Sequence, residues 1–176
     1  MNEVYLKGCV RDVTASHTLQ GADYDKAVVV TEQGEQFPIK CKHSATDNLE
    51  EPVSLYGQLR SYSNGSKTEV YIYTDFARQD DSDNFACITG NICSKGELCK
   101  GAKKCIVFVV ANNIYIKGLK INSYIPCVAF GEVAESIAQN YSVSDKIYVA
   151  GQMHIHNGRC EIVVGDICHC SDGCNV

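Results

Sequence analysis

The sequence predicts an all-β (mainly β) protein built as two tandem barrels, the second with a helix between strands 3 and 4. Two observations support this prediction. Short runs in which apolar and polar residues alternate recur along the 176-residue chain, and this is the period of half-buried strands. The chain also repeats two of its landmarks in the same order, which indicates that one domain has been duplicated.

The repeat is visible at two places. Residues 2–10 (NEVYLKGCV) are echoed by residues 84–92 (NFACITGNI), and residues 53–60 (VSLYGQLR) are echoed by residues 147–154 (IYVAGQMH). Each echo keeps one glycine at the same place: Gly8 matches Gly90, and Gly57 matches Gly151. We therefore predict that the two copies fold in the same way.

The domain boundaries follow from the polar stretch between the copies. Residues 79–84 are polar and acidic, which is the composition of a linker. We predict a first domain at residues 1–78 and a second at residues 85–170. A short tail, residues 171–176, would follow the second domain.

Strand positions follow from the alternation and from the turn residues between the runs. In the first copy we predict strands at residues 3–14, 26–33, 36–42, 53–62 and 68–76. In the second copy we predict strands at residues 85–95, 104–112, 122–130, 146–155 and 160–168. Each copy has an Asn-Gly dipeptide before its last strand, which favours a hairpin turn.

The stretch at residues 124–153 defines the kind of barrel. An apolar run of strand length ends at Gly131, and apolar residues then recur at helical spacing over 132–141. An alternating strand follows. One helix between the third and fourth strands of a five-stranded barrel is the OB-fold arrangement. In the first copy, residues 43–52 are too short and polar for this helix, so we predict a reduced OB barrel there.

The amino-acid sequence of this stretch resembles that of the bacterial single-stranded DNA-binding protein family. Residues 128–135 (VAFGEVAE) and 145–153 (DKIYVAGQM) are similar to a pattern that runs through the helix and fourth strand of that family. Residues 1–10 (MNEVYLKGCV) look like the opening of the same family, and residues 108–113 (FVVANN) look like its second strand. Two departures are that Val143-Ser144 replaces the usual Lys-Gly and that the chain has no Trp.

Charge and composition limit the possible functions. The net charge is −5, but residues 1–84 hold 8 Lys and Arg against 14 Asp and Glu, whereas residues 85–176 hold 8 against 7. The second copy is therefore the better candidate for a polyanion partner. No apolar run is long enough for a membrane span, and the N-terminal residues do not have the pattern of a signal peptide. We expect a cytoplasmic protein.

The expected cytoplasmic location determines how the 11 cysteines are interpreted. In a reducing compartment we expect free thiols, most of them packed as small apolar side chains. The segment from Cys168 to Cys174 is a possible partial metal site, but its spacing differs from paired C-x₂-C knuckles. We predict no metal and no other cofactor. The sequence also has no catalytic motif, so we predict that the protein is not an enzyme.

Binding of single strands needs aromatic rings that stack bases and cations that contact phosphates. The resemblance places stacking aromatics at Tyr124 and Phe130, with Tyr115 in a nearby loop. Packing in the core is the alternative for Phe130. The cations that flank this surface in the second copy are Lys103, Lys104, Lys117 and Lys120.

The first copy has fewer candidates. Lys40 and Lys42 alternate with apolar residues, so both should lie on the face opposite the core, and Phe37 precedes them as Tyr124 precedes its strand. Arg60 and Tyr62 lie near the last hairpin, where OB domains bind ligands. Tyr71 and Tyr73 also share a face, and we expect them to stabilise the sheet or to form an interface between the copies, and not to stack bases.

These observations predict sequence-independent binding and protection of single-stranded DNA in replication or recombination. The resemblance implies a four-domain assembly, and we therefore expect a homodimer, with neither a membrane nor a small-molecule substrate as partner. The alternative is a degenerate OB-fold module that mediates protein contacts in a replication or mobile-element complex. A third possibility is a primosome-type or RNA-binding OB protein.

Overall fold

The structure is a computed structural model that describes residues 1–19, 21–46, 51–65, 67–77, 84–101, 103–116 and 119–170. The elements of the first half are β1 (Asn2–Leu19), β2 (Ala22–Val30), β3 (Gln36–Lys42), the 3₁₀ turn η1 (His43–Ala45), β4 (Val53–Asn64) and β5 (Lys67–Ala77). Those of the second half are β6 (Phe85–Lys95), β7 (Cys105–Ile116), β8 (Leu119–Phe130), α1 (Gly131–Asn140), β9 (Lys146–His156) and β10 (Arg159–His169). Among the described residues, no helix has the length and apolarity that a membrane span requires.

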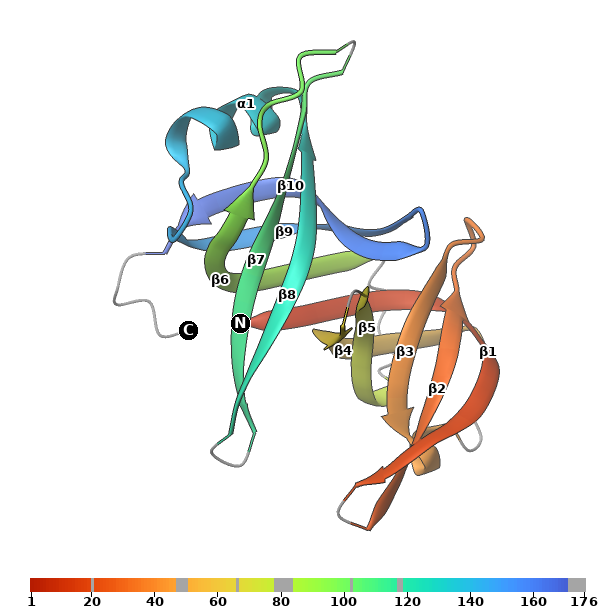
Figure 1. The fold of residues 1–176 in the computed structure, drawn as a ribbon. Helices are drawn as coiled ribbons and strands as arrows, with labels where there is room; N and C mark the ends of the chain where they lie inside the picture. Colours follow the sequence, from red (N-terminus) through yellow and green to blue (C-terminus); the bar gives the residue numbers. More distant parts are fainter. Residues whose placement is uncertain are drawn as a thin grey trace.

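The strands form two closed barrels of the same connectivity (Figure 1). The first has the order β2-β3-β5-β4-β1 and closes through β1–β2, and the second has the order β6-β7-β8-β10-β9 and closes through β6–β9. Each pairs its third and fifth strands in parallel and its other neighbours antiparallel. This is the connectivity of an OB barrel, so the predicted mainly β fold with two tandem OB barrels is confirmed.

The predicted helix over 132–141 is observed one residue earlier, as α1, and it buries Ala134 and Ile137. The predicted ends of the second and third strands of this copy are wrong. Residues 113–121 were expected to form a loop, but β7 continues to Ile116, β8 begins at Leu119, and Tyr115 pairs with Lys120. The predicted tail, residues 171–176, lies outside the described residues.

Close contacts between strands explain the repeated glycines. A Cβ at Gly8 would lie 2.4 Å from the Val30 carbonyl oxygen, and one at Gly90 would lie 2.4 Å from that of Ala111. These two glycines therefore allow β1 and β6 to cross closely over the next strand of their own barrel. A larger side chain at either position would push the strands of that barrel apart.

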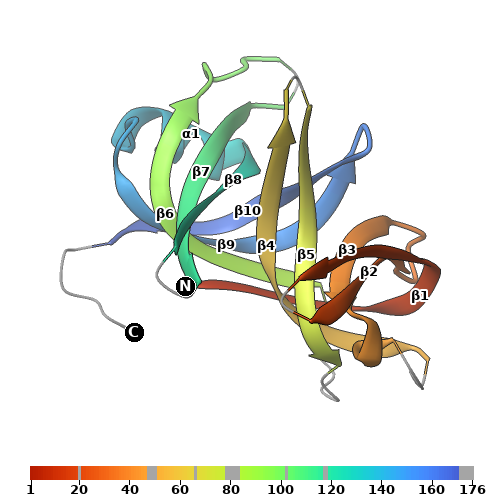
Figure 2. The same cartoon turned by 60° about the horizontal axis from the view of Figure 1, so that its bottom comes forward.

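The barrels are joined through their first strands. β1 pairs antiparallel with β6, and the register matches Val4 with Ala86, Glu3 with Cys87 and Tyr5 with Phe85. In the repeat, residue 4 corresponds to residue 86, so this register relates the two copies by a pseudo-two-fold rotation. The described strands therefore form one 10-stranded sheet, and each barrel contributes one half of its strands (Figure 2).

Two hydrogen bonds between the barrels are related by the same pseudo-two-fold rotation. The Ser61 backbone N–H donates to Ser123 Oγ of the second barrel at 3.3 Å. The Ile155 backbone N–H donates to Glu35 Oε1 of the first barrel at 3.1 Å. The two contacts occupy equivalent places in the strand registers, so the barrels contact each other in a repeated way on both sides of the β1–β6 pair.

Asn2 is the buried polar centre of the junction. Its side-chain amide donates to the Leu59 carbonyl at 2.7 Å and to Asn112 Oδ1 at 2.8 Å, and its Oδ1 accepts from the Leu59 N–H at 2.8 Å. Asn112, which is also buried, donates in turn to the Thr89 carbonyl at 2.7 Å. The network thus connects strands of both barrels without leaving these amides unpaired.

Asn84 repeats this arrangement in the second barrel. Its side chain donates to the Met153 carbonyl and accepts from the Met153 N–H, both at 2.7 Å. Asn84 was assigned to the linker, but it is fixed to the second barrel. Residues 79–83 of the predicted linker lie outside the described residues, so the domain boundaries stay a prediction.

We expect Asn2→Ala to destabilise the protein by about 1–3 kcal/mol for each backbone group of Leu59 that it leaves buried and unpaired. Urea unfolding followed by far-UV circular dichroism measures this effect. Asn91→Ala is the matched control, because Asn91 is exposed and makes one hydrogen bond, to the Ser144 carbonyl. Equal stability of the two variants would contradict the structural role given to Asn2.

Candidate nucleic-acid interface

The outer face of the first barrel combines cations with tyrosine rings. The strand registers pair Lys26 with Lys40, Lys40 with Tyr73, and Arg60 with Tyr71. Paired residues in neighbouring strands point to the same side of a sheet, and the opposite side carries the buried core. We call this surface the tyrosine–cation face; its members are Lys26, Lys40, Arg60, Tyr62, Tyr71 and Tyr73.

Cations and rings are in direct contact on this face. Lys40 Nζ lies 4.0 Å from the centre of the Tyr71 ring and 5.9 Å from that of Tyr62. Arg60 Cζ lies 3.6 Å from the centre of the Tyr73 ring. These are cation–π distances. The contacts hold the rings and the charges in place together, as a preformed surface.

Burial and like charge alter the proton affinity of the central lysine. The pKa of Lys40 is lowered, first by its partial burial among the rings and then by the nearby charge of Lys26. The pKa of Tyr71 is raised, mainly by burial. A bound anion would reverse the effect on Lys40, because it stabilises the protonated amine.

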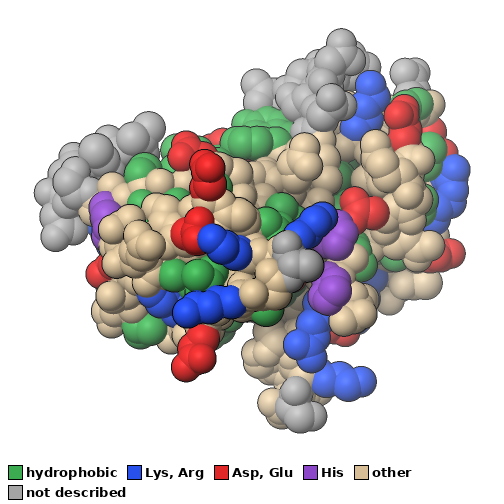
Figure 3. Space-filling view, turned by 90° about the horizontal axis from the view of Figure 1, so that it is seen from above, with side chains coloured by type: hydrophobic (Ala, Val, Ile, Leu, Met, Phe, Trp, Pro, Cys, Tyr) green, Lys and Arg blue, Asp and Glu red, His purple; other side chains and the backbone are tan. Residues whose placement is uncertain are grey.

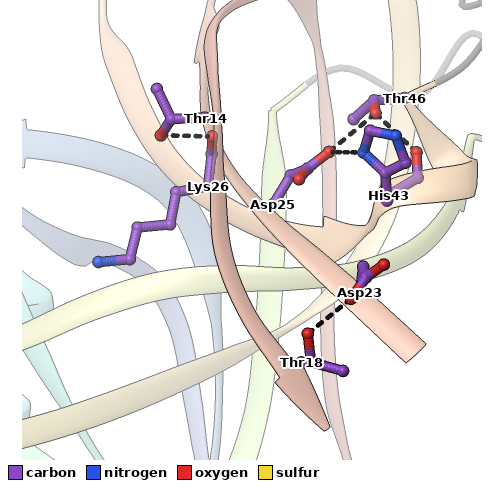
Figure 4. Close-up of polar contacts among 7 residues, drawn as sticks. All are labelled: Thr14, Thr18, Asp23, Asp25, Lys26, His43 and Thr46. Carbon is purple, nitrogen blue, oxygen red and sulfur yellow. Dashed lines mark hydrogen bonds and ion pairs between the residues drawn. The ribbon is translucent and has the colours of Figure 1, made fainter. Parts of the chain in front are cut away.

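The strand that carries Lys26 is fixed from its other side (Figure 4). Asp25 is buried, and its carboxylate accepts a hydrogen bond from His43 Nδ1 at 2.8 Å and one from the Thr46 hydroxyl at 3.1 Å. Asp25 and Lys26 point to opposite sides of β2 in Figure 4. This cluster attaches η1, which stands where the second copy has its helix, to the strand behind the tyrosine–cation face.

A groove continues the face toward the second barrel. Its volume is about 570 Å³, and Lys26, Lys40 and Tyr71 line it from the first barrel, together with the acidic residues Asp12 and Glu69. Pro126 and Arg159 line it from the second. The β9–β10 hairpin that carries Arg159 extends toward the first barrel in Figure 1. Seen from above, lysine, arginine and histidine side chains lie in the middle of the molecule beside acidic side chains (Figure 3).

The hairpin is shaped by the predicted Asn157-Gly158 turn. Both residues have positive φ, 50° and 72°, which is what a two-residue hairpin turn of this type requires. The turn leaves Arg159 exposed at the rim of the groove. Lys26 and Arg159 were not among the binding residues predicted from the sequence. Tyr24 and Lys26 alternate with residues of the other face of their strand, and this pattern would have identified Lys26 from the sequence.

A separate hollow surrounds Phe130 in the second barrel. Phe130 is 46% exposed at the start of α1, so the alternative that it packs in the core is wrong. Lys103 and Lys104, which were predicted to flank the same surface as Phe130, also line this hollow. Glu132 and Glu135 line it with them. Lys104 forms an ion pair with Glu135. Acidic side chains thus neutralise part of the positive charge around this ring.

Tyr124 is not part of the hollow around Phe130. The two residues are six positions apart along β8, roughly 20 Å in an extended strand. Tyr124 is 43% exposed, and its backbone N–H donates to Ser61 Oγ of the first barrel at 2.7 Å. Tyr62, the residue after Ser61 on β4, is 56% exposed.

The prediction that Phe37 is a binding residue is wrong. Phe37 is 0% exposed in the core of the first barrel. Pro38 and Pro126 hold equivalent places in the two registers, so Phe37 corresponds to the buried Ile125 and not to Tyr124. Successive residues in a strand point to opposite faces, and a shift of one residue therefore turned an inward side chain into an outward one.

The other predicted residues have different outcomes. Lys42 lies on the same side of β3 as Lys40, as predicted from the alternation, and pairs in register with Tyr24. Lys120 is exposed near the end of the β7–β8 hairpin. The side chain of Tyr115 and the whole of Lys117 lie outside the described residues, so their binding roles stay predictions.

The corresponding faces of the two barrels differ in chemistry. One row across β2, β3 and β5 of the first barrel consists of Lys26, Lys40 and Tyr73. The equivalent row across β7, β8 and β10 of the second consists of Val107, Val128 and Val163. The second face is therefore apolar where the first is cationic, and Val107 is 51% exposed.

Among the described residues, no group of three or more His, Cys, Asp or Glu side chains is arranged to hold a metal ion. Cys168 and Cys170 of the possible C-terminal metal site lie at the end of the last strand. Cys174 lies outside the described residues.

The fold and the tyrosine–cation face define a tandem OB-fold protein. No protein-family model and no curated protein matches the sequence. The structure, however, is similar to the wild-type single-stranded DNA binding protein from Thermus aquaticus, with a TM-score of 0.73 and 16% identity over 98% of this chain and 94% of that one. A deletion mutant of that Thermus aquaticus protein gives a TM-score of 0.72 and 14% identity over 98% and 95%. The resemblance stated from the sequence is therefore confirmed for the fold.

We expect Lys26→Met to raise the pKa of Lys40, because it removes the like charge that disfavours protonation of the Lys40 amine. Titration of the lysine side chains by NMR measures the shift. Lys120→Met is the control, since Lys120 lies in the second barrel near the end of a different hairpin. An unchanged Lys40 titration in Lys26→Met would contradict the proximity of the two charges.

Proposed function

We propose that this protein binds single-stranded DNA without sequence preference and protects it during replication or recombination in the cytoplasm. The observation that carries the proposal is the tyrosine–cation face, on which Lys40 and Arg60 each lie against a tyrosine ring. Binding of single strands without sequence preference needs these two features together, rings for bases and cations for phosphates. We propose a binding protein and not an enzyme.

The geometry of the face suits an extended strand. The rings of Tyr62, Tyr71 and Tyr73 lie on adjacent strands, and the groove beside them adds Arg159 from the second barrel. A single strand has unpaired bases that can stack on such rings, whereas a duplex keeps its bases stacked on each other. The preformed contacts also reduce the side-chain entropy that binding must overcome.

Two further residues extend the proposed surface. Tyr124 is exposed, and its backbone N–H contacts Ser61, the residue that precedes the exposed Tyr62. Phe130 with Lys103 is a separate platform in the second barrel. The likeness to the Thermus aquaticus single-stranded DNA binding protein supports the proposal through the fold.

A second candidate function is supported by the apolar face of the second barrel. Val107 and Phe130 are diagonal neighbours on β7 and β8, and both are about half exposed. Exposed apolar side chains of this kind favour protein contacts. In this alternative the module would mediate contacts within a replication or mobile-element complex, and the tyrosine–cation face would bind no strand.

The protein is also proposed to be a homodimer, because the resemblance implies assemblies of four OB domains. Multi-angle light scattering at micromolar concentration should give twice the chain mass of 19.3 kDa. The mass of one chain would contradict this proposal and leave strand binding untouched.

We expect the protein to bind labelled oligo-dT more tightly than a duplex of equal length, and more weakly as salt rises. Each phosphate that a lysine or arginine contacts releases counterions, so affinity falls as salt concentration increases. Fluorescence anisotropy at several salt concentrations measures both effects. Equally weak binding of oligo-dT and duplex at low salt would favour the protein-contact alternative.

We expect Tyr62→Ala to weaken oligo-dT binding by about 5- to 150-fold, because stacking on an aromatic ring contributes roughly 1–3 kcal/mol per base. The matched control is Phe85→Ala, since Phe85 is another exposed ring but lies at the β1–β6 junction, where it contacts Tyr5. If only Tyr124→Ala weakens binding, the strand follows the second barrel and not the tyrosine–cation face.

A further inference from the structure

Cys99 and Cys105 face each other at the base of the loop between β6 and β7. They form an antiparallel bridge. Both backbone hydrogen bonds of the pair are present, Cys99 N–H to the Cys105 carbonyl at 2.8 Å and Cys105 N–H to the Cys99 carbonyl at 3.3 Å. Residues paired in this way have Cα atoms about 5.5 Å apart, and that separation is within the range of disulfides, about 4.4–6.8 Å.

This register distinguishes the pair from the other described cysteines. In the strand pairings of the described residues, no other cysteine lies opposite a cysteine. Cys41, Cys87, Cys127 and Cys160 are buried in the barrels, where they pack as apolar side chains. Cys99 is exposed and Cys105 is half-buried, so an oxidant in solution reaches the pair.

The two thiols are close enough to affect each other. The pKa of Cys105 is raised, first by burial and then by the side chain of Cys99. This shift disfavours the Cys105 thiolate, and the exposed Cys99 is the residue that reacts first with an oxidant in solution. Cys105 then lies in place as the resolving thiol.

We propose that Cys99 and Cys105 form a reversible, redox-responsive disulfide. With hydrogen peroxide as the oxidant, the Cys99 thiolate attacks one peroxide oxygen and becomes a sulfenic acid, while the other oxygen leaves as water after protonation. The Cys105 thiol then attacks the Cys99 sulfur and expels the second water. The two sulfurs are oxidised by two electrons in total, and the peroxide is reduced.

The pair lies beside the hollow around Phe130. Cys105 pairs in register with Phe130 on β8, and the next residue back, Lys104, accepts a hydrogen bond from the Gly131 N–H at 2.9 Å. Oxidation would therefore connect the loop covalently to the edge of this hollow. A cytosolic disulfide of this kind is typically transient and redox-sensing, which agrees with the free thiols expected from the sequence.

Peptide mapping tests the proposal. The full-length protein is treated with a slight excess of hydrogen peroxide, its remaining thiols are blocked with N-ethylmaleimide, and it is digested with trypsin. Cleavage after Lys95, Lys100, Lys104 and Lys117 releases residues 96–100 and 105–117. We expect these two peptides to be joined, with a mass two hydrogens below their sum, and to separate on treatment with dithiothreitol.

Three variants make the result decisive. Cys99→Ser and Cys105→Ser should each abolish the joined peptides. Cys93→Ser should leave them unchanged, because the Cys93 thiol is exposed but donates to the Val109 carbonyl at 3.4 Å and lies in a different register. A sulfinic acid at Cys99, a bond from Cys99 to Cys168 or Cys170, or a disulfide between chains would overturn the proposal.

Discussion

The antiparallel pairing of β1 with β6 is the contact on which the rest of the structure depends. It relates the two barrels by a pseudo-two-fold rotation about Val4 and Ala86. That rotation places Ser61 against Ser123 on one side and Ile155 against Glu35 on the other. The groove that carries Lys26 and Arg159 exists because the barrels meet at this angle. A different register would separate these side chains.

The asymmetry of the two faces shows how duplication can divide a function. The same strand positions hold cations and rings in the first barrel and valines in the second. The barrel scaffold is preserved through glycines and asparagines that satisfy backbone contacts, whereas the outward side chains are free to differ. The scaffold residues are therefore alike in the two halves, and the surface residues are not.

Much of the fold could be predicted from the sequence, because its determinants are local or repeated. The matched glycines mark close strand crossings, and the helical spacing before Tyr141 gives α1 to within one residue. The binding surface was harder to predict. The Phe37 error came from a single-residue shift in the alignment, which reverses the direction of every side chain in a strand. Strand pairing, which fixes the shift, is a long-range property.

Net charge was also a poor guide to the surface. The first half was judged acidic, yet its outer face carries Lys26, Lys40 and Arg60 together. Three of the 14 acidic residues of that half, Glu32, Glu35 and Glu51, lie in connections between the described strands. A sum over residues does not distinguish a charge on a strand face from a charge in a connection.

Because both barrels belong to one chain, their association does not depend on the protein concentration. Where two separate subunits associate through their first strands, the associated fraction falls on dilution. Here β1 and β6 belong to one chain, so each is present to the other at an effective concentration that dilution does not change. The groove between the barrels therefore persists at concentrations where a pair of independent subunits would separate.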